Sequence, residues 1–164
     1  MIRVLAFLVV VGCAHGAAAP AAPAAPVAGP EWASLRAIIG TWQGSDPLKH
    51  SSGRFTLAPD LGGKVLVRRG TNESAQGHHE DLMVIEEGGK RATYWDNEGH
   101  VIAYAVTASA EHVEFLSDEI AGKPRFKLTY DVTAPDELTI EFGVELPGAG
   151  EFQHYTGGTV HRVR

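Results

Sequence analysis

The segment from Leu138 to Leu146 alternates without a break between apolar residues and polar or small ones. Thr139, Glu141, Gly143 and Glu145 stand between its five apolar side chains. Successive side chains of a β-strand point to opposite faces of the sheet, so this pattern predicts a strand with one buried face and one solvent-exposed face. A chain that contains such a segment must build a sheet that covers the buried face.

A second segment, Arg125 to Asp131, repeats this alternation. Ala134-Pro135-Asp136-Glu137 lies between the two segments and has the composition of a tight turn, in which proline sets the backbone angle. The two segments are therefore predicted to form an antiparallel hairpin. Its buried face should carry Phe126, Leu128, Tyr130, Leu138, Ile140 and Phe142.

Eight further segments have the length and composition of strands, and short joints rich in turn-forming residues separate them. They cover residues 41–45, 53–58, 63–71, 79–86, 91–96, 100–108, 111–117 and 151–163. A parallel sheet needs crossovers of about a dozen residues, which these joints do not supply. We predict an all-β fold, an antiparallel up-and-down meander that closes into a barrel of about eight to ten strands and so leaves no exposed edge.

One short N-terminal helix is expected over Glu31 to Ile39, where the apolar residues have helical spacing. The sequence Gly40-Thr41-Trp42-Gln43-Gly44 follows it and precedes the strands. This order resembles the calycin group, which includes lipocalins, fatty-acid-binding proteins and nitrobindins, and the resemblance covers about residues 35–164. Gly62 to Val67 and Tyr94 to His100 are similar to segments of bacterial lipocalin-like domains. The resemblance implies that Trp42 lies on the first strand and that its indole closes one end of the barrel.

The first thirteen residues have the features of an export signal. Arg3 precedes an unbroken apolar run from Val4 to Val11, which is too short to span a bilayer because a spanning helix needs ~20 apolar residues. Val10-Val11-Gly12-Cys13 resembles the lipobox of bacterial lipoproteins, which implies a signal over residues 1–13 and a lipid on Cys13. The alternative is an ordinary secretory signal that is cut near residues 17–19.

Residues 14–30 are rich in Ala and Pro and are predicted to form a tether rather than a helix or strand. A proline-rich segment of this length can hold a domain up to ~40 Å from a membrane. The lipoprotein resemblance implies an exported protein on the periplasmic side of the cell envelope. Ala14 after Cys13 favours the outer membrane.

Residues 31–164 are expected to form one domain, which holds all 20 acidic residues and all but one of the 14 Lys and Arg residues. A negative domain of this kind argues against nucleic acid or an anionic membrane surface as a partner, since both require clustered basic side chains. The membrane is therefore expected to be contacted through the lipid alone. Cys13 is the only cysteine, so the domain has neither a disulfide nor a thiolate metal site.

The sequence shows no catalytic pattern. No serine lies in a Gly-x-Ser-x-Gly setting, and no glycine-rich phosphate loop opens a helix. The adjacent pair His78-His79 would point to opposite faces of a strand, so a shared metal ion is not expected. Glu73 and Asp81, near Arg68 and Arg69, could form a polar cluster or surface ion pairs. We therefore predict a protein without catalytic activity, metal or resident cofactor.

His154 suggests an alternative function. If Phe152 points into the barrel, alternation places His154 inside as well. Nitrobindins carry a haem-ligating histidine on a late strand, so this resemblance implies a haem or nitrogen-oxide site at His154. The competing interpretation is a histidine that faces solvent or bonds to neighbouring hydroxyls.

The many aromatic side chains of the predicted barrel indicate a possible ligand site in its interior. A barrel of this size is either filled by its own side chains or holds one small ligand. We expect it to bind a small apolar or amphipathic molecule, and the alternative is a filled barrel that docks an envelope partner through its outer face. The candidate ligand-binding residues are Trp42, Tyr94, Trp95, Tyr104, Phe126, Tyr130, Phe142 and His154.

Overall fold

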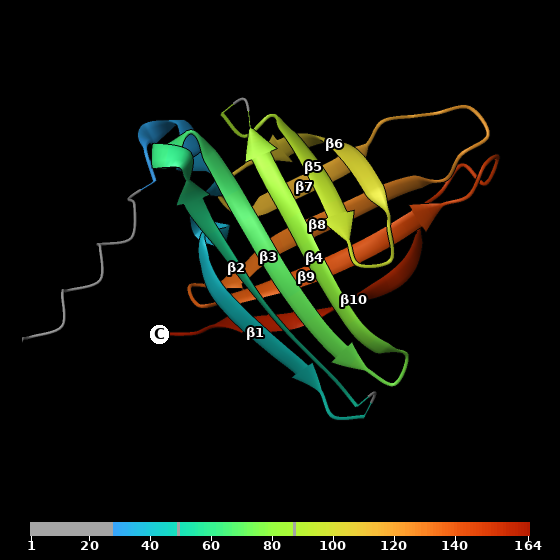
Figure 1. The fold of residues 1–164 in the computed structure, drawn as a ribbon, viewed down its shortest axis with the longest axis horizontal. Helices are drawn as coiled ribbons and strands as arrows, with labels where there is room; N and C mark the ends of the chain where they lie inside the picture. Colours follow the sequence, from blue (N-terminus) through green and yellow to red (C-terminus); the bar gives the residue numbers. More distant parts are fainter. Residues whose placement is uncertain (1–27, 49, 87) are drawn as a thin grey trace, which may run out of the picture.

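Ten antiparallel strands close into a single up-and-down barrel in the computed structural model, which describes residues 28–164 except residues 49 and 87 (Figure 1). The strands are β1 (Gly40–Asp46), β2 (Ser51–Asp60), β3 (Val65–Ser74), β4 (Gly77–Glu86), β5 (Arg91–Asp96), β6 (Val101–Ala108), β7 (His112–Ser117), β8 (Arg125–Ala134), β9 (Glu137–Glu145) and β10 (Gln153–Arg162). Each strand pairs with its neighbours in sequence, and β1 pairs with β10. The predicted fold class is confirmed.

The expected helix is a 3₁₀ helix, η1 (Pro30–Ile38), rather than an α-helix. A 3₁₀ helix has three residues per turn, so Trp32, Leu35 and Ile38 line up on one side, and all three are buried. The indole Nε1 of Trp32 donates a hydrogen bond to the carbonyl of Gly63, 2.9 Å away. This contact fixes η1 to the end of the barrel where β2 turns into β3 through a short 3₁₀ turn, η2 (Leu61–Gly63).

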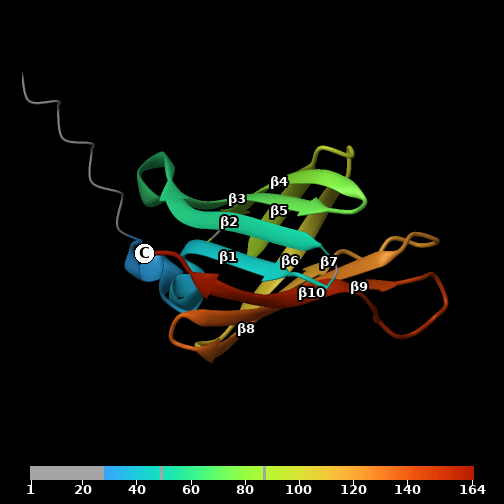
Figure 2. The ribbon, with the colours of Figure 1, turned by 90° about the horizontal axis from the view of Figure 1, so that it is seen from below.

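Trp42 seals the same end, which we call the capped end. Its side chain is fully buried, and its Nε1 donates to the carbonyl of Ile38 at 2.9 Å. The guanidinium of Arg162 covers the indole at 4.1 Å from the ring centre and donates to the carbonyls of Ile39 (2.7 Å) and Ala37 (3.0 Å). The last strand is thus tied to the chain just before the first strand, and Figure 2 shows η1 and the C-terminus side by side.

The seam between β1 and β10 is short. The two strands pair only at Trp42 with Arg162 and at Gln43 with His161. The rest of β10 pairs with β9 alone, and its register shifts between His154 and Thr156. The paired registers of β1 and β10 therefore lie near the capped end. Toward the opposite end of the barrel, which we call the open end, β10 pairs only with β9.

The β8–β9 hairpin has the predicted register and turn. Leu128 pairs with Phe142, Tyr130 with Ile140 and Val132 with Leu138, and all of these side chains share the inner face. The two strands are joined at Pro135 and Asp136. The predicted buried face of the hairpin is confirmed.

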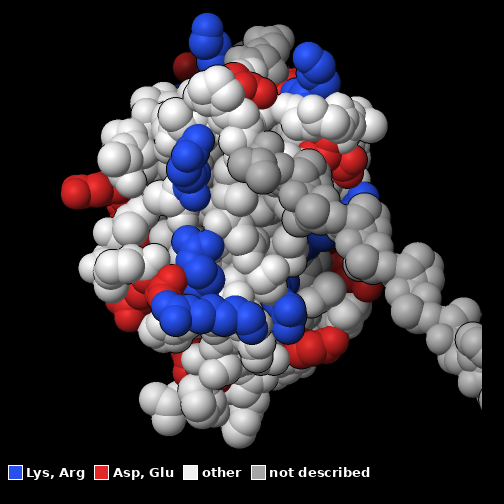
Figure 3. All heavy atoms as spheres, turned by 90° about the vertical axis from the view of Figure 1, so that its left-hand side faces the viewer, with Lys and Arg blue, Asp and Glu red and all other residues white. Residues whose placement is uncertain are grey.

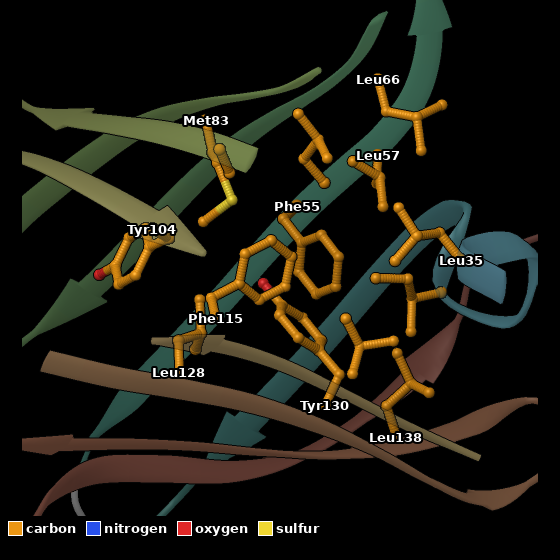
Figure 4. Packing of buried hydrophobic residues seen from close by; sticks show 14 of the residues in the cluster. Leu35, Phe55, Leu57, Leu66, Met83, Tyr104, Phe115, Leu128, Tyr130 and Leu138 are labelled. Atoms are coloured by element: carbon orange, nitrogen blue, oxygen red, sulfur yellow. The ribbon is translucent and has the colours of Figure 1, made fainter. Parts of the chain in front are cut away.

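The core fills the capped half and the middle of the barrel, as Figure 4 shows. In the middle, the ring of Tyr130 packs edge-on against Phe55 and against Phe115, with 5.8 Å between ring centres in each case. Tyr104 continues the row against Phe115 at 6.1 Å. Aromatic side chains from β2, β6, β7 and β8 thus form a floor across the barrel.

The predicted signal, Cys13 and nearly all of the predicted tether lie outside the described residues. Within residues 28–164, no helix has the length and apolar character that crossing a membrane requires.

Candidate functional site

The open half of the barrel lies beyond the aromatic floor, and its inner wall is only partly buried. Its inward-facing side chains keep partial exposure, although they point into a closed sheet: these are His79, Tyr94, Ile102, Phe126 and Phe142. Phe126 and Phe142 stack with ring centres 6.0 Å apart, and Tyr155 packs edge-on against Phe142. Tyr155 itself is 73% exposed. An apolar wall inside the barrel is therefore accessible from the open end.

A buried ion pair forms part of the floor. Arg68 on β3 and Asp81 on β4 both point inward and bond to each other, with side chains only 15% and 9% exposed. The guanidinium of Arg68 also lies over the ring of Phe55, 4.7 Å from its centre. Of the four charged residues considered from the sequence, Arg68 and Asp81 form this internal pair, whereas Arg69 is exposed on the outer face and Glu73 bonds to His78 there. Exposed ion pairs contribute little to stability, whereas a buried pair strongly constrains its surroundings.

Gly70 makes room for this pair. A Cβ atom at position 70 would collide with the Asp81 carboxylate and would lie 2.9 Å from Nη1 of Arg68. Gly70 is buried and has an ordinary extended backbone, so its role here is to supply space rather than conformational freedom.

Two polar atoms at the floor make no hydrogen bond of ordinary geometry among the described residues: Nε of Arg68 and the hydroxyl of Tyr130, both shielded from solvent. The Arg68 side chain nevertheless lies close enough to the Tyr130 hydroxyl to oppose the rise in its pKa. An unsatisfied buried group costs ~1–3 kcal/mol. Burial lowers the pKa of Arg68, but Tyr130 and Asp81 raise it further, so the pKa lies well above its ordinary value and the side chain stays charged.

Tyrosine hydroxyls line the floor in their neutral form. Burial raises the pKa of Tyr94, Tyr104 and Tyr130 above the ordinary value. The Tyr94 hydroxyl lies 3.0 Å from Nε2 of His79 and donates to Asp96 at 3.4 Å. These hydroxyls offer hydrogen bonds and no charge.

Asp96 organises the turn between β5 and β6 beside this wall. Its carboxylate accepts hydrogen bonds from the backbone N–H groups of Glu98 (3.0 Å) and His100 (2.9 Å) and lies 2.8 Å from Nδ1 of His100. Burial raises the pKa of Asp96, but the hydrogen bonds from His100 and Glu98 outweigh burial and hold the pKa below its ordinary value.

Asp96→Asn is expected to lower the free energy of unfolding by about 1 kcal/mol at pH 7, because hydrogen bonds to a charged acceptor are stronger than those to an amide. A carboxylate whose pKa is depressed by folding stabilises the protein above its unfolded pKa, and this contribution is lost as the pH falls through the folded pKa. The gap between Asp96→Asn and wild type should therefore close below pH 3.8. Urea denaturation at pH 7 and pH 3 measures it, with Glu119→Gln in an exposed loop as the control. A gap that persisted unchanged at pH 3 would contradict the role given to the charge.

The structure brings six of the eight candidate ligand-binding residues to the barrel interior. Trp42 lies at the capped end, and Tyr104 and Tyr130 lie in the floor. Tyr94, Phe126 and Phe142 lie in the open half. Trp42 is enclosed by η1 and Arg162 and therefore holds the fold together.

Trp95 and His154 point to the outside. Trp95 follows inward-facing Tyr94 on β5, so alternation turns it outward, where it is 38% exposed. Phe152 also lies outside, with Nζ of Lys127 at 4.7 Å from its ring centre, and His154 lies beside Glu141 with Nδ1 at 2.6 Å from Oε2. The premise that Phe152 points inward is not met, so His154 does not face the interior.

His78 and His79 lie on β4 rather than in a loop, and they point to opposite faces as alternation predicts. His78 bonds to Glu80 and Glu73 on the outside, and these hydrogen bonds raise its pKa. Among the described residues, no group of three or more His, Cys, Asp and Glu side chains is placed to hold a metal ion.

The two best-formed pockets among the described residues lie outside the core. One, of about 180 Å³, runs over the outer face of β8, β9 and β10 beside Phe152. The other, of about 140 Å³, lies between the loops 119–123 and 146–148 at the open rim. Of the partly exposed inward-facing side chains of the open half, only Phe142 lines one of these two pockets.

Charged and apolar side chains occupy different parts of the outer surface. Figure 3 shows Lys and Arg side chains in a band on the face around the capped end, with acidic side chains at its margins. By contrast, apolar and small side chains cluster on the outer face of β3 to β6, where Leu82 pairs with Trp95 and Trp95 with Val101, and the charged Arg69 borders the cluster opposite Leu82. We call this the outer apolar face, and it consists of Val67, Leu82, Val84, Thr93, Trp95, Val101, Ala103 and Ala105.

Sequence reasoning did not place Arg68, Asp81 and Gly70 together inside the barrel. The signal was present in the alternation, since Arg68 and Gly70 stand two and four residues after the buried Leu66. Comparison with known proteins leaves the site to be interpreted from its residues: no protein-family model matches the chain, and no curated protein matches it.

Proposed function

We propose that the open half of the barrel binds a small apolar or amphipathic molecule and does not transform it. The observation that carries the proposal is the accessible aromatic wall of Phe126, Phe142 and Tyr155, which faces the polar floor around Arg68. Such a pocket suits a ligand with an apolar body and one polar group. The short seam between β1 and β10 leaves the open end room to admit it.

Phe142→Ala is expected to weaken binding of the neutral fluorophore N-phenyl-1-naphthylamine at least ~10-fold, because burying an aromatic side chain against a ligand is worth ~1.5–3 kcal/mol. Trp95→Ala removes an aromatic ring from the outside of the barrel and should leave the affinity unchanged. Fluorescence titration of the purified protein measures both. Equal losses in the two variants, or no saturable binding by wild type, would contradict a site inside the barrel.

The outer apolar face supports a second candidate function, docking of another envelope protein. Monomeric proteins rarely expose large apolar patches, and Val101, at the edge of this face opposite Trp95, is 64% exposed. A photo-crosslinking residue at Val101 would capture such a partner in cells, while the same residue at Thr159 on the polar outer face of β10 would not. Identical products from both positions would remove this candidate.

A lipid anchor at Cys13 is part of the proposal and rests on the lipobox resemblance of residues 10–13. The location proposed with the anchor is the periplasmic side of the outer membrane, which the lipobox resemblance and Ala14 after Cys13 favour. Within the described residues, Ala28 packs against the core next to η1, at the capped end where Figure 3 shows the basic band.

Cys13→Ser is expected to release the protein into the soluble envelope fraction without changing the melting temperature, because the residue precedes the barrel. Membrane fractionation and incorporation of labelled palmitate measure the anchor, and Ser34→Ala on η1 is the control. A Cys13→Ser protein that stayed in the membrane pellet would place the anchor elsewhere.

A further inference from the structure

A groove runs over the outside of the barrel across β8, β9 and β10, three neighbouring strands that Figure 2 shows side by side. We call it the outer groove, and its volume is about 180 Å³. Thr129 belongs to its lining and is only 9% exposed, although its neighbours Leu128 and Tyr130 face the core and Thr129 therefore points outward. The groove thus has an enclosed floor.

Two glycines on the outer face leave space for the walls of this groove. A Cβ atom at Gly143 would lie 3.3 Å from the carbonyl oxygen of Gln153 and 3.5 Å from Cβ of Phe152, so the missing side chain lets Phe152 lie against the sheet. A Cβ atom at Gly157 would lie 3.0 Å from Cδ of Glu141. Neither glycine has a positive φ, so both supply space rather than conformational freedom.

The polar groups of the outer groove include both donors and acceptors. Nδ1 of His154 lies 2.6 Å from Oε2 of Glu141, and a neutral imidazole that donates through Nδ1 leaves Nε2 as an acceptor. The ammonium of Lys127 lies 4.7 Å from the centre of the Phe152 ring and forms no ion pair among the described residues. Its N–H groups are therefore donors that a ligand can use. The hydroxyl of Thr129 can donate or accept.

The charge and size of the outer groove limit what it can bind. With a neutral imidazole, its charged side chains are Lys127 and Glu141, so an anion or a cation would be attracted by one of them and repelled by the other. A purely apolar molecule would cover polar groups without giving them hydrogen bonds. Pockets for drug-sized molecules have ~300–1,000 Å³, so about 180 Å³ suits a unit no larger than one ring. A small uncharged ring that carries hydroxyl groups and C–H faces is a sugar residue.

We propose that the outer groove binds one uncharged sugar residue of a glycan. The hydroxyl groups of the sugar exchange hydrogen bonds with Thr129, Lys127 and the pair of Glu141 and His154, and its C–H groups pack against the ring of Phe152. The groove lies on the outer face, so this inference goes beyond the ligand proposed for the interior and does not depend on it.

Three glycosides with the same ring test the charge argument. Methyl β-D-glucopyranoside is uncharged, methyl β-D-glucuronide carries a carboxylate at C6, and methyl 6-amino-6-deoxy-β-D-glucopyranoside carries an ammonium there. Titration of the ¹⁵N-labelled full-length chain at pH 7.5 follows the backbone amides of Gly143 and Gly157 by NMR. The uncharged glycoside is expected to bind at least ~3-fold more tightly than either charged one.

Thr129→Val keeps the shape of the side chain and removes the hydroxyl, so it should weaken binding of methyl β-D-glucopyranoside ~2- to 10-fold. Thr139→Val makes the same change on the outer face of β9 outside the groove and should leave the affinity unchanged. Melting temperatures show whether both variants fold. Gln153→Leu, at an exposed position of the groove, makes the same test if Thr129→Val does not fold.

A charged glycoside that bound as tightly as the uncharged one would overturn the inference. Equally tight binding of cyclohexylmethanol, a ring with a single hydroxyl, would do so too, because the groove would then select an apolar ring. Equal effects of Thr129→Val and Thr139→Val, or no saturable shift at Gly143 with methyl β-D-glucopyranoside, would also contradict it. None of these results bears on the interior, which the titration with N-phenyl-1-naphthylamine reports separately.

Discussion

Leu138→Lys is expected to unfold the barrel at neutral pH, whereas Thr139→Lys should leave it folded. Leu138 is fully buried on β9, next to the capped end, within the cluster of apolar side chains that forms the core. An ammonium placed there without a partner costs several kcal/mol, against a total stability of ~5–15 kcal/mol for a domain of this size. Thr139 lies one residue further on the outer face, opposite Asp131, so a lysine there changes stability by under ~1 kcal/mol.

Circular dichroism and urea denaturation distinguish the two variants at once. The new side chain is identical and the positions are adjacent, so any difference reports the face on which each residue lies. Loss of structure in both variants, or in neither, would show that the β8–β9 register is not the one described here.

Asp81→Ala is expected to lower the free energy of unfolding by about 3–5 kcal/mol, since it leaves the charge of Arg68 buried and unpaired. Removing both charges in Arg68→Met/Asp81→Leu should restore most of this loss, because a buried ion pair is often replaced by apolar side chains at little cost. Urea denaturation of Arg68→Met, Asp81→Leu and the double variant measures the coupling between the two side chains. A double variant as unstable as Asp81→Ala alone would show that the two side chains do not act as a pair.

The fold could be predicted from the sequence because its information is local. Alternation in Leu138 to Leu146 sets which side chains face inward, and Pro135 and Asp136 mark the turn to the preceding strand. A closed meander needs only such local rules, since each strand pairs with the next. The 3₁₀ form of η1 was also present in the three-residue spacing of Trp32, Leu35 and Ile38.

The site was harder to predict because it depends on which face each strand turns to the interior. Tyr94 and Trp95 are adjacent, so only one of them could point inward, and the sequence alone did not decide between them. On β10 the shift in register near Tyr155, rather than at Gly157 and Gly158, decides the face of His154. Arg68 and Asp81 are charged, so composition favours the surface for them, and only their meeting inside the barrel makes burial tolerable.

The joining of β1 to β10 also governs when the fold can be completed. Every other strand pair is a hairpin that can form as the chain emerges, but the bond from Arg162 to Ile39 spans 123 residues and must wait for the last strand. Until then, β1 offers a row of unpaired backbone groups, which is the kind of edge through which chains aggregate. A protein cut before β10 would keep two such edges, on β1 and β9. Pairing of the C-terminal strand with β1 and β9 therefore protects both edges from association with other chains.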